Sequence, residues 1–215
     1  NSSRNVKMNF LILFLGKLIS FASKILNLGN GSTWPGHIAL KLDPKFIEKT
    51  FKNSNTKIIL ISGTNGKTTT AKLIETILTN ENMKVFTNSS GANLSNGIAS
   101  ALVLNSSITG KINKDFAIFE VDENALPKIT KLIEPDYIIA LNLFRDQLDR
   151  YGELDSISKK WKEAYKELKK TTFILNADDP LIAYLGKYQK SVYYVGLEDK
   201  TIGYTSTQHA ADSIL

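Results

Sequence analysis

One short stretch of the chain brings together the side chains best suited to bind a phosphate. Lys67 and Thr68 stand at the start of a helical pattern, directly after a turn that contains Gly63 and Gly66. A lysine ammonium can contact the outer phosphates of a nucleotide, and a threonine hydroxyl can ligate Mg²⁺. The glycines let the backbone approach an anion closely, and a helix N-terminus attracts negative charge. The stretch predicts a phosphate loop, although Ile61 stands where the pattern G-x-x-x-x-G-K-[ST] has its first glycine.

The rest of the chain alternates between strand and helix patterns. We expect strands at 57–62, 84–88, 115–120, 136–142, 171–176 and 191–196, and helices at 67–80, 95–104, 124–134, 155–169 and 180–189. This alternation predicts an α/β fold, with a P-loop parallel sheet of about six strands and helices on both faces. Ligands of such sheets collect at the carboxyl ends of the strands, so residues that follow a strand are the candidates for the site.

Acidic residues follow two of these strands. Glu120 ends the third strand and is the best candidate for a Mg²⁺ ligand opposite the phosphate loop, with Asp122 next. Asp122 and Glu123 also suit the start of the following helix, where negative charge is favoured. Asp179, which precedes Pro180, suits a helix cap as well as a nucleotide contact.

The charge of the chain is unevenly distributed. The 215 residues carry a net charge of +6, but residues 1–57 hold nine Lys or Arg against two acids, whereas the remainder holds 18 against 19. The nucleotide-binding part is therefore nearly neutral, which argues against a nucleic-acid partner. The basic segment favours an anionic partner, such as a membrane surface or a phosphorylated substrate. The chain has no cysteine, which excludes a disulfide framework within it and is compatible with the cytoplasm.

The N-terminal segment predicts an amphipathic helix with a wide apolar face from Phe10 to Leu26. Residues 1–8 are expected to be disordered, and residues 38–52 to form one short element. The apolar run is interrupted by lysines and is too short to span a membrane. Two interpretations fit: the helix packs on the domain, or it lies in a membrane interface. We expect two parts, residues 1–52 with this helix, a Gly-rich loop and a basic connector, and residues 53–215 with the nucleotide site.

The variant Gly-Thr-Asn-Gly-Lys-Thr-Thr at 63–69 resembles the phosphate loop of the Mur ligase family, whose members phosphorylate a carboxylate with ATP before an amine attacks it. The resemblance implies the central ATP-binding domain of that family, with ATP and Mg²⁺ as cofactors. It assigns the nucleotide to Gly63, Thr64, Asn65, Gly66, Lys67, Thr68, Thr69 and Asn176, the metal to Thr68 and Glu120, and catalysis to Lys67, Glu120 and Asn93. Taken alone, Asn93 also suits an ordinary loop.

The runs 142–155 and 209–213 resemble the MurT branch, which forms the synthetase-like subunit of lipid II isoglutaminyl synthases. This implies activation of the D-glutamate α-carboxylate of the peptidoglycan stem as an acyl phosphate, followed by amidation. Lipid II is the implied substrate, and a glutaminase subunit is the implied partner. Gln147 stands where many Mur ligases have a metal-binding His, and Trp161 where they have a carbamylated lysine. Whether a second metal binds is therefore left open, and the helical pattern places Trp161 in the core.

The zinc ribbon and C-terminal domain of that branch do not follow within these residues, so the chain is expected to be a truncated front part that binds ATP without completing ligation. Two alternatives are another Mur-type ligase similar to folylpolyglutamate synthase, and a non-catalytic ATP-binding fragment. We expect the chain in the cytoplasm, with peripheral contact at the inner face of the cell membrane.

Overall fold

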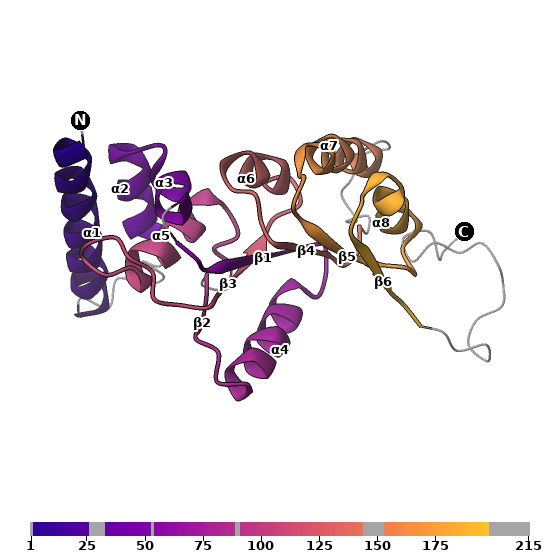
Figure 1. Ribbon diagram of the computed structural model, residues 1–215, viewed down its shortest axis with the longest axis horizontal. Coiled ribbons are helices and arrows are strands. Elements are labelled where there is room, and N and C mark those ends of the chain that lie inside the picture. Colours follow the sequence, from indigo (N-terminus) through magenta and orange to yellow (C-terminus); the bar gives the residue numbers. More distant parts are fainter. Residues whose placement is uncertain (1, 26–32, 53, 89–90, 144–152, 198–215) are drawn as a thin grey trace. The chain divides into compact units, whose positions relative to one another are not determined.

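A computed structural model describes residues 2–25, 33–52, 54–88, 91–143 and 153–197 (Figure 1). Its strands are β1 (Lys57–Ser62), β2 (Val85–Thr87), β3 (Phe116–Val121), β4 (Tyr137–Ala140), β5 (Thr172–Asn176) and β6 (Val192–Val195). They form one six-stranded sheet in the order β2-β3-β1-β4-β5-β6. The pairs β2–β3, β1–β4, β4–β5 and β5–β6 are parallel. The expected α/β fold around a six-stranded parallel sheet is confirmed.

The helices are α1 (Ser2–Ile25), α2 (Trp34–Leu42), α3 (Phe46–Lys52), α4 (Lys67–Asn80), α5 (Ser95–Asn105), α6 (Leu126–Leu132), α7 (Glu153–Glu167) and α8 (Pro180–Leu185), with a 3₁₀ helix η2 (Gly186–Tyr188). Two expectations were wrong near the N-terminus. Residues 2–8 are helical rather than disordered, because α1 begins at Ser2. Helices α2 and α3 are separate because Pro44 disfavours a helical residue before it, and Asp43 is accordingly extended (φ −142°, ψ 99°).

The chain divides into two compact units. The first unit comprises residues 1–58 and 71–120, and the second comprises residues 59–70 and 121–215. In the first unit, α2 packs closely against α5. Gly36 N donates to Ser100 Oγ (2.8 Å), and a Cβ on Gly36 would lie only 1.9 Å from Asn96 O. The absence of a side chain at Gly36 therefore permits this helix contact.

In the second unit, α6, α7 and α8 lie over one face of strands β4, β5 and β6 (Figure 1). The apolar stripe of α7 and the residue after it is buried as the sequence predicts, at Ile157, Trp161, Ala164, Tyr165 and Leu168. Trp161 and Tyr165 have no exposed surface, and the Tyr165 ring centroid lies 4.6 Å from that of Phe173 on β5. This aromatic contact attaches α7 to the sheet.

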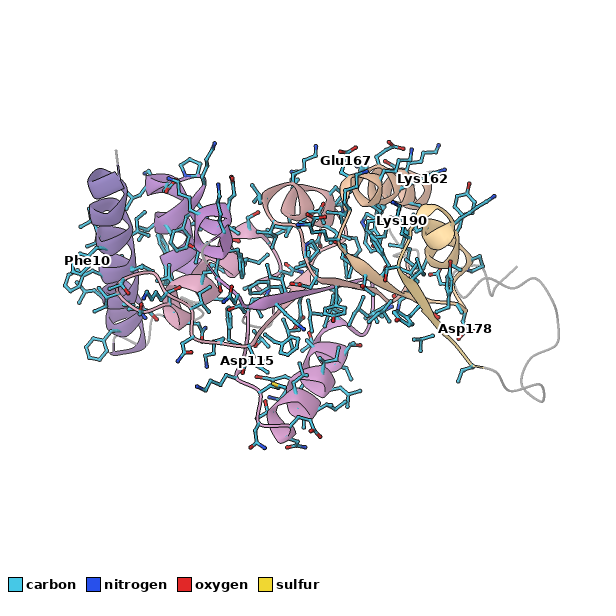
Figure 2. The ribbon with its side chains drawn as sticks, in the orientation of Figure 1. Phe10, Asp115, Lys162, Glu167, Asp178 and Lys190 are labelled. Carbon is cyan, nitrogen blue, oxygen red and sulfur yellow. The ribbon has the colours of Figure 1, made fainter. Side chains whose placement is uncertain are left out.

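The N-terminal helix α1 has two apolar faces. Ile12 and Leu13 are buried within the first unit, to which α1 belongs. The other face carries large apolar side chains that are 46–64% exposed: Phe10, Leu11, Phe14, Leu18 and Phe21. Figure 2 shows Phe10 pointing away from α2 and α5. Within the described residues, no helix is long and apolar enough to cross a membrane.

Candidate nucleotide-binding site

The phosphate loop, residues 63–66, connects β1 to α4. Gly63 (φ +146°) and Gly66 (φ +86°) both have positive φ, a conformation that L side chains rarely adopt. A Cβ on Gly63 would also lie 2.9 Å from Asn142 N. Helix α4 begins at Lys67, directly after this turn. The turn therefore places the N-terminus of α4 at the carboxyl end of β1, as the sequence predicts, and the binding of an anion there stays a prediction.

Asn142 holds the phosphate loop from the end of β4. Asn65 N donates to Asn142 Oδ1 (2.8 Å), and Asn142 Nδ2 donates back to Asn65 O (3.1 Å). Thr64 N donates to Asn142 O (2.9 Å). The amides of Thr64 and Asn65 thus bond within the protein. Phosphate binding by Gly63, Thr64, Asn65, Gly66 and the residues after them stays a prediction. This role of Asn142 was not predicted from the sequence, because nothing near it in the chain signals the contact.

The amine of Lys67 lies among three oxygen atoms of the second unit. It donates to Gly63 O and, over 3.1 Å, to Thr64 O. It also forms an ion pair with Glu123, whose Oε2 lies 3.7 Å from Lys67 Nζ. The sequence pattern indicated Glu123 only as a helix start. The structure instead places its carboxylate beside the lysine of the phosphate loop.

Glu120 and Asn93, two further candidates, belong to the first unit. Glu120 is buried at the end of β3. Its N–H donates to Asn88 Oδ1 (2.9 Å), while Asn88 Nδ2 donates to Glu120 O (2.9 Å) and to Ala92 O (2.7 Å). Asn88 therefore connects the end of β3 to the loop in which Asn93 lies half-exposed. The roles of Glu120 and Asn93 at the phosphates stay predictions.

Two candidate residues lie at and just after the end of β5, Asn176 and Asp179. Asp179 caps α8, accepting from Leu181 N (2.9 Å) and Ile182 N (3.2 Å), and its other oxygen accepts from Leu143 N (2.8 Å). The predicted cap is confirmed. Asn176 Nδ2 donates to Leu141 O (2.7 Å), which links the ends of β5 and β4. A nucleotide contact by Asn176 stays a prediction.

The donors that the sequence assigns to Mg²⁺ are chemically suited to it. In the described part of the chain, no three His, Cys, Asp or Glu side chains gather as a metal site. Mg²⁺ that arrives with a nucleotide needs few protein ligands, because phosphates and water fill most of its coordination shell. A threonine hydroxyl and one carboxylate, Thr68 and Glu120, are hard oxygen donors that fit this requirement. Their joint binding stays a prediction.

Of the two positions that depart from the usual Mur ligase pattern, Trp161 and Gln147, the structure describes only Trp161. Trp161 is buried, as expected, and its indole N–H donates to Glu123 O (2.8 Å). Gln147, Asp146, Asp149 and Arg150 lie outside the described residues.

The chain has recognisable relatives. The family model described as the Mur ligase middle domain matches residues 61–214. The chain is 36% identical over 186 residues to a protein named lipid II isoglutaminyl synthase (glutamine-hydrolyzing) subunit MurT from Staphylococcus aureus (strain COL), covering 86% of this chain and 41% of that one. It is 38% identical over 172 residues to a protein of the same name from Streptococcus pneumoniae (strain ATCC BAA-255 / R6), covering 80% and 37%.

Solved structures agree at the level of fold. MurF ligase from Thermotoga maritima, solved in complex with ADP, superposes with a TM-score of 0.61 at 21% identity, over 77% of this chain and 37% of that one. The chain spans about two fifths of the length of the MurT proteins it matches. The family model covers well over half of its residues. The chain therefore belongs to the Mur ligase family.

Proposed function

We propose that the chain is the ATP-binding part of an ATP-dependent ligase that forms a carbon–nitrogen bond. The observation that carries the proposal is the phosphate loop, with Lys67 at the start of α4 and Asn142 holding its backbone. Membership of the Mur ligase family supports the same activity. The complex of Thermotoga maritima MurF with ADP supports a nucleotide as the ligand of this fold.

More specifically, we propose that the chain serves a lipid II isoglutaminyl synthase and activates the D-glutamate α-carboxylate of the peptidoglycan stem peptide. ATP supplies the phosphoryl group that turns the carboxylate into an acyl phosphate, with ADP as the leaving group. Ammonia then attacks the acyl carbon, phosphate leaves with its electron pair, and the nitrogen loses a proton. Similarity to two MurT proteins over at least 80% of the chain supports this assignment.

The chain's own residues act in this scheme by position and charge. Lys67 and the first amides of α4 hold the outer phosphates and offset the charge that develops on them. Thr68 and Glu120 would hold Mg²⁺, and Asn93 would approach the reacting phosphate. We propose lipid II as the substrate and a glutaminase subunit as the partner that provides ammonia. The words "glutamine-hydrolyzing" and "subunit" in the names of the two relatives support such a partner.

Trapping of the acyl phosphate tests this function. The chain is incubated with ATP, Mg²⁺ and a soluble lipid II analogue, together with its candidate glutaminase partner, and hydroxylamine replaces ammonia as the nucleophile. We expect a hydroxamate on the α-carboxylate, detected by mass spectrometry, together with ADP. An analogue whose D-glutamate is already amidated should give none. ADP formation without hydroxamate would refute the assigned carboxylate, while leaving ATP binding intact.

Glu120→Gln is expected to weaken ATP binding in the presence of Mg²⁺ by about tenfold, because the amide keeps the shape of the side chain but removes a charged oxygen ligand. Binding in EDTA should change much less. Titration calorimetry in the two buffers measures both. If affinity falls equally in both buffers, Glu120 has a structural role.

We further propose that the chain works in the cytoplasm and contacts the inner face of the cell membrane through α1. The exposed apolar face of α1, defined above, spans about 100° of the helix, and its Phe10 and Phe14 rings stack at 6.3 Å. Lys17 lies at one edge of this face, donates to Leu104 O (3.2 Å), and has its pKa lowered by burial. The surplus of basic residues in 1–57 complements anionic lipid headgroups.

A paired substitution tests the membrane contact. Phe14→Ser with Leu18→Ser is expected to reduce sedimentation with phosphatidylglycerol vesicles several-fold, because it removes apolar area from the face that would enter the interface. Leu73→Ser with Ile77→Ser removes two exposed apolar residues from α4 and is the matched control. Equal sedimentation of both variants would contradict the proposal. The proposal would also be contradicted if the Phe14→Ser/Leu18→Ser variant kept its vesicle binding and instead lost a dimer that the original chain forms, as measured by analytical ultracentrifugation.

A further inference from the structure

Glu123 faces the amine of the phosphate-loop lysine. Its Oε2 lies 3.7 Å from Lys67 Nζ, and the same amine donates to the main-chain oxygens of Gly63 and Thr64. All four residues belong to the second unit. The lysine that is expected to contact phosphate therefore already has one carboxylate and two carbonyl partners.

The main chain around Glu123 is anchored from two directions. Trp161, which has no exposed surface, donates its indole N–H to Glu123 O (2.8 Å). The preceding residue closes the turn, because Asn124 N donates to Asp122 Oδ1 (2.9 Å) and Ala125 N donates to Asp122 O (3.0 Å). The carboxylate therefore extends toward Lys67 from a fixed backbone, rather than from a surface loop.

The burial of the pair makes the contact effective. The side chains of Lys67 and Glu123 are each only 15% exposed. Opposite charges that are partly removed from water attract each other more strongly than an exposed pair does. A phosphate that approaches Lys67 must therefore compete with a carboxylate for the same amine, and that carboxylate also repels the phosphate.

We propose that Glu123 is a positioning residue that competes with the nucleotide for Lys67 and so lowers the affinity of the phosphate loop, most strongly for ADP. This inference rests on the proposed binding of ATP by that loop. ADP presents fewer phosphate oxygens to Lys67 than ATP does, so Glu123 competes more effectively with ADP. When the amine returns to Glu123 after phosphoryl transfer, it favours departure of the product.

Calorimetric titration of the 215-residue chain with ATP and with ADP, each in Mg²⁺ and in EDTA, tests the proposal. Glu123→Gln removes the charge but keeps the main-chain oxygen that Trp161 contacts. Glu163→Gln removes the same charge from an exposed pair with Lys166 on α7 and is the matched control. We expect E123Q to bind ADP about tenfold and ATP about threefold more tightly in both buffers, with E163Q unchanged. Glu123→Asp should lie between E123Q and the original chain.

Unchanged affinities in E123Q would overturn the proposal. A loss of affinity confined to Mg²⁺ would overturn it as well, because Glu123 would then act as a metal ligand. If neither E123Q nor the original chain binds nucleotide, the proposed function fails. The ion pair between Lys67 and Glu123 can then be tested by itself, by measuring the Tm of Lys67→Met, E123Q and the double variant. Non-additive Tm shifts would support the pair, and additive shifts would refute it.

Discussion

Replacing Lys67 with alanine is expected to reduce the affinity for ATP by about ten- to a hundredfold while leaving the fold intact. A hydrogen bond to a charged group contributes about 1.5–3 kcal/mol, which corresponds to this range in binding constant. The loss should lie near its upper end, because Glu123 would then face the phosphates without its counter-ion. Calorimetry in Mg²⁺ at moderate salt measures the affinity, and circular dichroism measures the Tm.

Lys72→Ala is the matched control for this prediction. Lys72 lies on the same helix, and its side chain is 74% exposed in a surface pair with Glu75. Its removal takes the same charge from α4 without touching the phosphate loop, so ATP affinity should change less than about twofold. Equal effects of the two substitutions would mean that the general charge of α4, and not the position of Lys67, attracts the nucleotide.

The largest effect on stability is expected from Gly36→Ala. The new Cβ would lie 1.9 Å from Asn96 O and 2.6 Å from Ser100 N, both main-chain atoms that cannot rotate away. Helices α2 and α5 would have to separate, and the buried bond from Gly36 N to Ser100 Oγ would be lost. We expect a loss of about 3 kcal/mol, or a Tm lower by about 6–12 °C.

Gly16→Ala tests whether the cost comes from the main-chain clash. A Cβ on Gly16 would lie 2.7 Å from Val103 Cγ1, a side-chain methyl group that can move. We therefore expect a smaller fall in Tm than for Gly36→Ala. A Gly36→Ala chain that unfolds within about 2 °C of the original would show that α2 and α5 pack less closely than described.

The sequence predicted the order of strands and helices because apolar periodicity is a local property. The expected bounds of β1 and α4 agree fully with the structure. The helical stripe that placed Trp161 in the core also proved correct. The pattern missed the break between α2 and α3, where the effect of Pro44 on the residue before it outweighs the helical preference of its neighbours.

The candidate site was only partly accessible from the sequence. Glycine, lysine and threonine at fixed spacing identify a phosphate loop, because the spacing itself creates the geometry. The contacts of Asn142 with Asn65 and of Glu123 with Lys67 join residues that are far apart in the chain. They arise from pairing of strands and packing of Trp161, so no local pattern could have revealed them.

The contact between Asn142 and Asn65 affects when the phosphate loop can form as the chain folds during synthesis. The two residues are separated by 77 positions, and their contact follows the pairing of β1 with β4. A chain emerging from the ribosome therefore cannot shape the phosphate loop until Asn142 has been synthesised and β4 has docked. The phosphate loop therefore becomes able to bind a nucleotide only late in folding, after β1 and β4 have paired correctly. By mass action, a captured nucleotide would in turn hold β1 and β4 together against local unfolding.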